Sequence, residues 1–321
     1  MHFRESGERE SGEGAGRVLV VGSVNLDTGY SVERLPRDGE TITSTGAREG
    51  GGGKGANQAL AAQQLGAAVS LLACVGRDGD RALEDLAAAG VDLGPVVRHP
   101  DAPTGRAVLL VTPSDNAIVV HPGANALLTA AHVTDHAAHT PAPQVVILQH
   151  EIPPEVVAAA VRAYRGRALV VLNPSPYREL DDEIRAGIDL LVVNHGELSD
   201  LLGRELPADP ADLAQVLAGA PPGDVVVTLG PHGALVRQGT TVTSVRPVPV
   251  DAVDTVGAGD TFLGALAAQL AQGVADLPGA VRHAVAAATL AVTTRGARNP
   301  DLSPTAVREL LAATPCPEGR P

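Results

Sequence analysis

The residues most clearly able to do chemistry are the glycines and the carboxylate of the segment 254–266, which reads DTVGAGDTFLGAL. Gly257 and Gly259 allow backbone N–H groups to gather around an anion, and a helix that begins there points its positive end at the same place. Asp260 stands beside this pocket, where it can take a proton from an attacking hydroxyl. Together with Ala258, these residues predict a phosphoryl-transfer site. The same segment also fits a tight turn in which Asp260 is the N-cap of the helix.

Two other nucleotide-binding motifs do not fit the glycine-rich segments. The run 50–55 around Lys54 would need glycine in place of Arg48 and serine or threonine in place of Gly55 to be a P-loop. The glycines before Asp260 would need a third glycine at Phe262 to form a dinucleotide fingerprint. A hydride-transfer enzyme is therefore a poor alternative.

The segment 254–266 resembles the C-terminal signature of the ribokinase, or PfkB-type, family of sugar and nucleoside kinases. The stretch 52–58, Gly-Gly-Lys-Gly-Ala-Asn-Gln, resembles the family's N-terminal signature in the form typical of ribokinases. Further matches are the segments 22–27, 121–125, 149–151, 173–176, 194–197 and 228–233. Because the matches occur in the family's order, the resemblance covers the chain from about residue 17 to about residue 311.

Composition favours an acidic enzyme rather than a small binding module. The chain has 321 residues, a formal net charge of −13 and a sequence pI near 5.1. That charge opposes nonspecific attraction to nucleic acid and to anionic membranes, so neither is an expected partner. The two cysteines, Cys74 and Cys316, have neither metal-site spacing nor an evident disulfide partner, which favours a reducing cytoplasm. No apolar run is long enough to cross a bilayer.

Short apolar runs alternate with alanine-rich helical stretches, which predicts a three-layer, doubly wound and mostly parallel α/β sheet. The expected strands are 17–22, 68–75, 144–148, 169–172, 190–193 and 225–229, and the expected helices are 55–65, 81–89, 154–164, 260–270, 280–294 and 305–313. Segments 28–45 and 106–120 break this rhythm and predict a separate small sheet. In the family that the chain resembles, such a sheet is a lid over the sugar and pairs two subunits into a homodimer. We expect one kinase domain at 17–313, between a disordered tail at 1–16 and a C-terminal tail at 314–321.

A sugar pocket needs several carboxylate and amide groups because each hydroxyl both donates and accepts hydrogen bonds. The resemblance assigns this role to Asn25, Asp27, Gly53, Lys54, Asn57, Glu151 and Asp260. Taken singly, Asp27 also fits a turn, Asn57 the first turn of a helix, and Lys54 a solvated charge. Their joint match in the family's order favours the sugar-binding role.

On the nucleotide side, the resemblance implies that Asn194 and Glu197 organise Mg²⁺ and the phosphates of ATP, largely through water. Magnesium keeps most of its waters and meets proteins through one or two carboxylates, so a sparse acidic motif suits it. Thr228, Gly230 and Gly233 are expected at a strand end against the phosphates and the ribose of ATP, with Gly259 in the anion loop. A plain turn fits the segment 228–233 as well.

The resemblance implies ATP-dependent phosphorylation of D-ribose at O5, which yields D-ribose 5-phosphate and ADP. In this interpretation Asp260 removes the proton, and the amides of 257–259 stabilise charge on the γ-phosphate. Fructose, deoxyribose, ketodeoxygluconate or a nucleoside are alternative acceptors within the same fold. A sugar-binding sensor without catalysis is an alternative from a different class, although Asp260 and the anion loop are intact.

The resemblance also implies an activating potassium ion beside the anion loop. The matching positions are Asp254, Val256, Ala291, Thr294, Gly296 and Pro300, which offer mostly backbone carbonyls. Pro300 departs from the family pattern, because members often carry serine there. Proline keeps its carbonyl but provides no hydroxyl ligand, and the neighbouring Asp301 is a possible substitute.

Overall fold

The computed structural model describes residues 15–113, 116–219 and 223–314, so most of the predicted N-terminal tail and residues 315–321 of the C-terminal tail lie outside the described residues. A central sheet has the strand order β14-β13-β12-β11-β10-β9-β1-β4. These strands are β1 (Arg17–Val21), β4 (Ala68–Leu72), β9 (Val145–Gln149), β10 (Leu169–Asn173), β11 (Leu190–Asn194), β12 (Asp224–Thr228), β13 (Ala234–Gln238) and β14 (Thr241–Val245). The strands from β4 to β12 run parallel, whereas β13 pairs antiparallel with both β12 and β14.

Helices cover both faces of this sheet because successive residues of each strand point to opposite sides. Val18 and Val20 join one buried cluster, while Leu19 and Val21 join the other. The first cluster packs against α1 (Lys54–Gln64), α2 (Gly79–Ala89), α8 (Ala258–Ala271), α9 (Leu277–Ala291) and α10 (Pro304–Ala313). The second packs against α3 (Ala130–His139), α4 (Pro154–Tyr164), α5 (Asp182–Gly187), α6 (His195–Leu202) and α7 (Pro210–Ala218). The predicted three-layer α/β architecture is confirmed.

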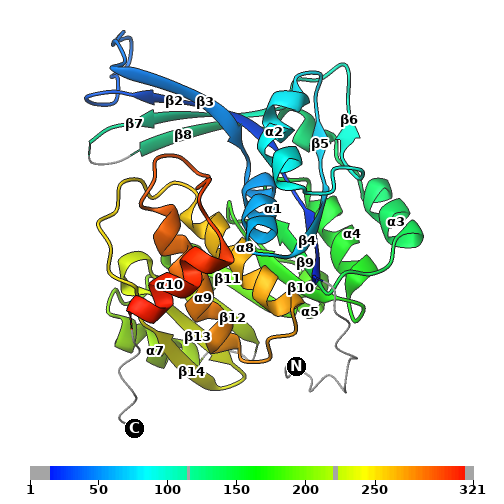
Figure 1. The fold of residues 1–321 in the computed structure, drawn as a ribbon, viewed down its shortest axis with the longest axis vertical. Coiled ribbons are helices and arrows are strands. Elements are labelled where there is room, and N and C mark those ends of the chain that lie inside the picture. The colour runs from blue at the N-terminus through cyan, green and yellow to red at the C-terminus, as the bar shows by residue number, and fades with distance from the viewer. Residues whose placement is uncertain (1–14, 114–115, 220–222, 315–321) are drawn as a thin grey trace.

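A separate four-stranded sheet extends from this body at the upper left of Figure 1. Its order is β3-β2-β7-β8, with β2 (Asn25–Ser31), β3 (Gly46–Gly52), β7 (Gly105–Val111) and β8 (Asn116–His121). The predicted small sheet is confirmed, but its first segment, expected as 28–45, has different limits. Residues 32–45 form loops and turns, and the missed strand β3 lies in a glycine-rich run. Glycine has low strand propensity, so only the pairing with β2, from Asn25 with Gly52 to Ser31 with Gly46, specifies this strand.

Smaller elements complete the described chain. The strands β5 (Cys74–Val75) and β6 (Val97–Arg98) form a short parallel pair, and η1 (Gly123–Leu127) and η2 (Gly230–His232) are single 3₁₀ turns. The expected strand 68–75 is interrupted at Ala73, where β4 ends and β5 begins. Within the described residues, no helix combines the length and the apolar character that a bilayer span requires.

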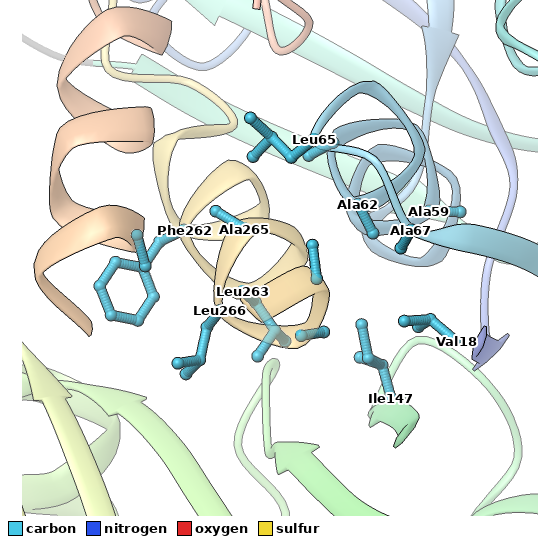
Figure 2. Close-up of a cluster of buried hydrophobic side chains, with 14 of the residues drawn as sticks. Val18, Ala59, Ala62, Leu65, Ala67, Ile147, Phe262, Leu263, Ala265 and Leu266 are labelled. Atoms are coloured by element: carbon cyan, nitrogen blue, oxygen red, sulfur yellow. The ribbon is translucent and has the colours of Figure 1, made fainter. Parts of the chain in front are cut away.

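Close packing of α1 against α8 determines where the two signature motifs lie relative to each other. Figure 2 shows a cluster of buried apolar side chains from α1 and α8 above Val18 of β1 and Ile147 of β9, with Phe262 on the side of α8 away from α1. The labelled residues are Val18, Ala59, Ala62, Leu65, Ala67, Ile147, Phe262, Leu263, Ala265 and Leu266. Gly264 makes the approach possible, because a Cβ atom there would lie 2.5 Å from the Gln58 carbonyl oxygen. The N-terminal ends of both helices are therefore held side by side at the edge of the sheet.

Candidate active site

The anion loop forms the N-terminus of α8. Gly257 is the N-cap residue, with a left-handed φ of 79°, and a Cβ atom there would lie 2.3 Å from the Ala297 carbonyl oxygen. Only glycine fits both constraints. No side chain caps this helix, so first-turn N–H groups, including that of Gly259, remain available to an anion. A Cβ atom at Gly259 would meet nothing within 4 Å, which shows that this side of the loop is open.

Asp260 lies in the first turn of α8 and is held there by the other signature motif. Its side chain is buried, and its Oδ1 accepts a hydrogen bond from Nε2 of Gln58 at 2.9 Å. Its Oδ2 accepts a hydrogen bond from Nδ2 of Asn57 at 3.1 Å. Asp260 is therefore not the N-cap, which Gly257 provides. The two amides orient the carboxylate, and each oxygen keeps a lone pair for a further partner.

Glu151 links the N-terminal signature, residues 52–58, to the end of β9. Its Oε2 accepts a hydrogen bond from the Ser23 hydroxyl at 2.6 Å and another from the backbone N–H of Lys54 at 3.0 Å. Oγ of Ser23 in turn accepts a hydrogen bond from the N–H of Gly55 at 3.2 Å. Gly53 precedes this turn with φ 87°, and a Cβ atom there would lie 2.8 Å from the backbone N of Asn25. The structure thus brings Gly53, Lys54 and Glu151 together.

Asp27 lies on strand β2 of the small sheet, near the carboxylates of Glu151 and Asp260. Burial raises the pKa of Asp27 to about 6, Arg298 opposes this rise, and Glu151 and Asp260 add to it. Its Oδ1 is buried and has no hydrogen-bond partner among the described residues. Because a Cβ atom at Gly52 would lie 2.0 Å from Oδ2 of Asp27, this glycine leaves room for the carboxylate. An unpaired buried carboxylate oxygen is what a pocket for sugar hydroxyls requires.

Part of the Asn25 side chain is already used in a hydrogen bond within the protein, which its motif does not indicate. It is buried, and its Oδ1 accepts a hydrogen bond from Nδ2 of Asn125 at 2.8 Å. Asn125 also accepts from the N–H of Val24 at 2.9 Å and donates to the Val24 carbonyl at 3.1 Å. Nδ2 of Asn25 remains the group that can face a ligand. The structure therefore gives Asn125, in the 121–125 motif, a positioning role that the motif alone did not reveal.

Lys54 carries a positive charge that interacts with three carboxylates, those of Asp260, Glu151 and Glu197. Burial alone lowers the pKa of the Lys54 ammonium, but Asp260, Glu151 and Glu197 attract its charge, so the pKa is raised overall. The ammonium therefore stays protonated at neutral pH. Because the predicted sugar ligands Asp260 and Glu151 and the predicted nucleotide ligand Glu197 all attract its charge, Lys54 lies between the two predicted halves of the site.

Asn194 and Glu197 form a capping box at the start of α6. The N–H of Glu197 donates to Oδ1 of Asn194 at 2.8 Å, and the N–H of Asn194 donates to Oε2 of Glu197 at 2.9 Å. Nδ2 of Asn173 also donates to this Oε2, at 3.4 Å. The motif thus has a structural role in capping the helix. Within the part of the chain that the structure describes, the other carboxylate oxygen, Oε1 of Glu197, accepts no hydrogen bond, so it can meet water or a hydrated cation.

The segment 228–233 follows the neighbouring strand. Thr228 is the last residue of β12 and pairs with Asn194 at the end of β11, so the two predicted nucleotide motifs lie at one edge of the sheet. Gly230 and Gly233 have φ values of 54° and 86° around the η2 turn. A Cβ atom at Gly233 would lie 2.2 Å from the Val245 carbonyl oxygen, so packing against β14 explains this glycine, whereas Gly230 has open space.

Asp254 is anchored between the anion loop and the segment that follows α9. Its Oδ1 accepts from the N–H of Val256 at 3.1 Å, and its Oδ2 accepts from the N–H of Gly296 at 2.9 Å. Partial burial raises the pKa of Asp254, but these two amides and Arg48 outweigh that effect and lower it. The Nη1 atom of Arg48, on the lid strand β3, lies 3.3 Å from Oδ2. The structure thus brings Asp254, Val256 and Gly296 together.

The other predicted cation ligands belong to the same segment. The carbonyl of Ala291 accepts hydrogen bonds from the N–H of Thr294 at 3.3 Å and from its hydroxyl at 3.2 Å. Pro300 is exposed, and the N–H of Asp301 donates to Oδ1 of Asn299 at 2.8 Å. Ala291 and Thr294 therefore share a turn that is linked to Asp254 through Gly296.

Arg298 is the main site residue that sequence reasoning missed. Its Nε donates to Oδ1 of Asn57 at 2.9 Å, and its Nη2 donates to the Gly52 carbonyl at 3.3 Å. Its side chain is 9% exposed. No motif includes this arginine, and 241 residues separate it from Asn57, so only the fold reveals the contact.

Comparison with known proteins identifies the family. Residues 15–305 match the family described as pfkB family carbohydrate kinase. The chain belongs to this family. This pfkB family member is 35% identical over 300 residues to the ribokinase of Bacillus subtilis, and the match covers 92% of this chain and 99% of that protein. The predicted family and enzyme class, a sugar kinase, are confirmed.

Other relatives of this pfkB family member have related names. The deoxyribokinase of Salmonella typhimurium is 33% identical over 291 residues, covering 88% of this chain and 94% of that protein. The bifunctional ribokinase/ribose-5-phosphate isomerase A of Fructilactobacillus sanfranciscensis is 34% identical over 290 residues; the chain spans 54% of that longer protein. The structure of Arabidopsis thaliana ribokinase complexed with ribose and ATP superposes with a TM-score of 0.80 at 30% identity, covering 92% of this chain and 98% of that one.

Proposed function

We propose that this chain transfers the γ-phosphoryl group of ATP to the O5 hydroxyl of D-ribose and releases D-ribose 5-phosphate and ADP. The observation that carries the proposal is the geometry of Asp260. Its carboxylate is buried at the uncapped, glycine-rich N-terminus of α8, and amides from the other signature motif hold both its oxygens. A proton acceptor and an anion-binding helix end therefore occupy one place, which is what phosphoryl transfer to an alcohol requires.

The residues divide the chemistry between them. Asp260 accepts the proton of the O5 hydroxyl, while the N–H groups at the start of α8, around Gly259, stabilise charge on the γ-phosphate. Asp27 and Glu151 accept hydrogen bonds from sugar hydroxyls that do not react, so they fix the position of the sugar. The Lys54 ammonium, which the surrounding carboxylates keep protonated, adds positive charge between sugar and nucleotide.

Mg²⁺ accompanies ATP in this proposal, and the available donors fit it. Among the described residues, no group of three or more acidic, histidine or cysteine side chains is placed to hold a metal ion, so the protein offers sparse acidic ligands rather than a cage. Mg²⁺ commonly binds in this way, through phosphates, water and one carboxylate. Oε1 of Glu197 would contact its hydration shell, and Asn194 would hold Glu197 in place through the capping box. The ion would neutralise phosphate charge.

A potassium site at Asp254 belongs to the same proposal. The donor types would suit a large, weakly hydrated cation, because Asp254 provides one carboxylate and Val256, Ala291, Thr294, Gly296 and Pro300 each offer a backbone carbonyl. Asp254 also accepts the N–H of Val256, the residue before the Gly257 N-cap. Charge neutralised at Asp254 would therefore steady the loop that receives the γ-phosphate.

We also propose a cytoplasmic homodimer that pairs through the lid. Strand register places Tyr30, Val108 and Val119 on the lid face opposite Asp27. Their side chains are 38%, 39% and 70% exposed, which is unusual for such apolar residues gathered on one small sheet. Covering this face with a second copy would bury them while Asp27 remains directed at the sugar.

2-Deoxyribose is the second candidate acceptor, because the deoxyribokinase relative covers almost the same residues at nearly the same identity. An ADP-release assay should compare ribose, deoxyribose, fructose, ketodeoxygluconate and nucleosides at equal concentrations. We expect the highest kcat/KM with D-ribose. A higher value with another acceptor would refute the assignment of ribose. Sugar binding without ADP release for any acceptor would instead support the sensor.

A further inference from the structure

Arg298 is a buried cation that no motif predicts and that reaches three parts of the site at once. It comes from the segment after α9 and contacts Asn57 on α1, the Gly52 carbonyl on β3 and, through Nη1, Oδ2 of Asp85 on α2 at 3.2 Å. A Cβ atom at Gly51 would lie 2.3 Å from this Nη1. The guanidinium therefore lies directly against the glycine backbone of the lid strand, which explains why glycine occupies that position.

The contact with Asn57 determines which way its amide points. A guanidinium only donates hydrogen bonds, and an ionised carboxylate only accepts them. Oδ1 of Asn57 must therefore face Arg298, and Nδ2 must face Asp260, as observed at 2.9 Å and 3.1 Å. Without Arg298, the Asn57 amide could rotate and would lose the partner that specifies its orientation.

The positive charge of Arg298 also affects the neighbouring carboxylates. Asp27 lies near the carboxylates of Glu151 and Asp260, and burial favours protonation of Asp27. Arg298 opposes the rise in the pKa of Asp27, while burial lowers the pKa of Arg298 itself and Asp85, Asp27 and Asp260 counteract that effect. Other charged groups that act on Asp27 are Glu151, beyond β9, and Arg48, on β3.

We propose that Arg298 is a positioning residue for phosphoryl transfer, which acts through Asn57 to hold Asp260 in its reactive orientation and ties strand β3 to helix α1. The inference rests on the proposed role of Asp260. It adds a long-range contact that couples the segment after α9 to the base. Small displacements of reacting groups can cost about 100-fold in rate, so the loss of this contact has a measurable effect.

A double-mutant cycle tests the route of action. We expect Arg298→Ala to lower kcat roughly 10- to 100-fold with the KM for ATP changed less than about 3-fold. In an Asn57→Ala background, the same change should lower kcat by less than about 3-fold, because its route is already lost. Arg298→Lys, which keeps the charge without the fork of donors, should lose most of the same activity and serves if the alanine variant does not fold.

Two matched variants separate positioning from general stabilisation. The Asp85 side chain is 56% exposed, so its ion pair with Arg298 lies near solvent. Asp85→Asn weakens only this contact of Arg298, and kcat should therefore change less than about 3-fold. Arg295→Ala removes an exposed arginine from the same segment and should leave kcat unchanged. Equal fold-losses for Arg298→Ala in both Asn57 backgrounds, or near-normal kcat in both Arg298 variants, would overturn the inference. Substantial turnover by Asp260→Asn would refute the proposed base itself, independently of Arg298.

Discussion

Asp27 provides a direct test of how binding and stability oppose each other in this site. Its pKa is raised from 3.8 to about 6, first by burial and then by Glu151 and Asp260. Between pH 4 and pH 6 the folded chain therefore binds more protons than the unfolded chain, so the free energy of unfolding decreases as pH rises through this window. Above pH 7 the carboxylate is ionised in both states. Ionised Asp27 then lowers the free energy of unfolding by about 3 kcal/mol relative to the protonated side chain.

The perturbation is Asp27→Asn, which removes the charge and keeps the size of the side chain. At pH 8 we expect the variant without sugar to be more stable than the parent by up to about 3 kcal/mol, a rise in Tm of roughly 5 °C. At pH 4 the difference should nearly vanish, because the parent carboxyl is then protonated in the folded state. Ribose should raise the Tm of the parent and have little effect on the variant, which lacks the carboxylate that accepts sugar hydroxyls.

The assay is thermal and urea unfolding of both proteins at pH 4 and pH 8, with and without ribose. Asp251→Asn, which neutralises an exposed aspartate, is the matched control and should change stability little at either pH. Equal stability of Asp27→Asn and the parent at pH 8, or a gain of the same size at both pH values, would refute the electrostatic reasoning. Undiminished stabilisation of the variant by ribose would remove Asp27 from the sugar pocket.

Three further predictions follow from the same geometry. Asp260→Asn should lower kcat by about 10²- to 10⁴-fold in the ADP-release assay with ribose binding nearly intact by calorimetry, and near-normal turnover would contradict its role as base. Gly264→Ala should destabilise the fold by about 1–3 kcal/mol in urea unfolding and lower kcat, whereas Gly219→Ala, at the C-cap of α7 with room for a methyl group, should do neither; equal behaviour of the two variants would argue against tight α1–α8 packing. Initial rates should be higher in potassium than in sodium or a bulky organic cation at equal ionic strength, and Asp254→Ala should abolish the difference; equal rates for the parent in all three salts, with contaminating potassium excluded, would show that no cation acts there.

The sequence was sufficient to predict the fold class and the convergence of the two signature motifs. Alternating apolar runs predict a buried parallel sheet, and the glycines around Lys54 and Asp260 belong to motifs that the structure joins through α1 and α8. Strand β3 was missed because glycine carries no strand signal and only pairing with β2 specifies it. Arg298 was missed because its partners lie far away in the sequence.

The nucleotide side shows a different limit of sequence reasoning. Asn194 and Glu197 fit both a phosphate-organising motif and a helix cap, and the structure shows that the capping hydrogen bonds do form. Gly233 likewise has a packing explanation against β14. Residue type and spacing alone do not separate these roles, because the same short hydrogen bonds can serve the helix and position a group for a ligand.

The position of the transferred phosphoryl group tests the central claim most directly. D-Ribose and MgATP should be incubated with the parent and with Asp260→Asn, and the products analysed by proton–phosphorus correlation NMR. The account predicts a phosphorus signal coupled to the two H5 protons of ribose, formed rapidly by the parent and only in traces by the variant. Coupling to the anomeric proton, or no ribose phosphate while another acceptor is phosphorylated, would contradict it.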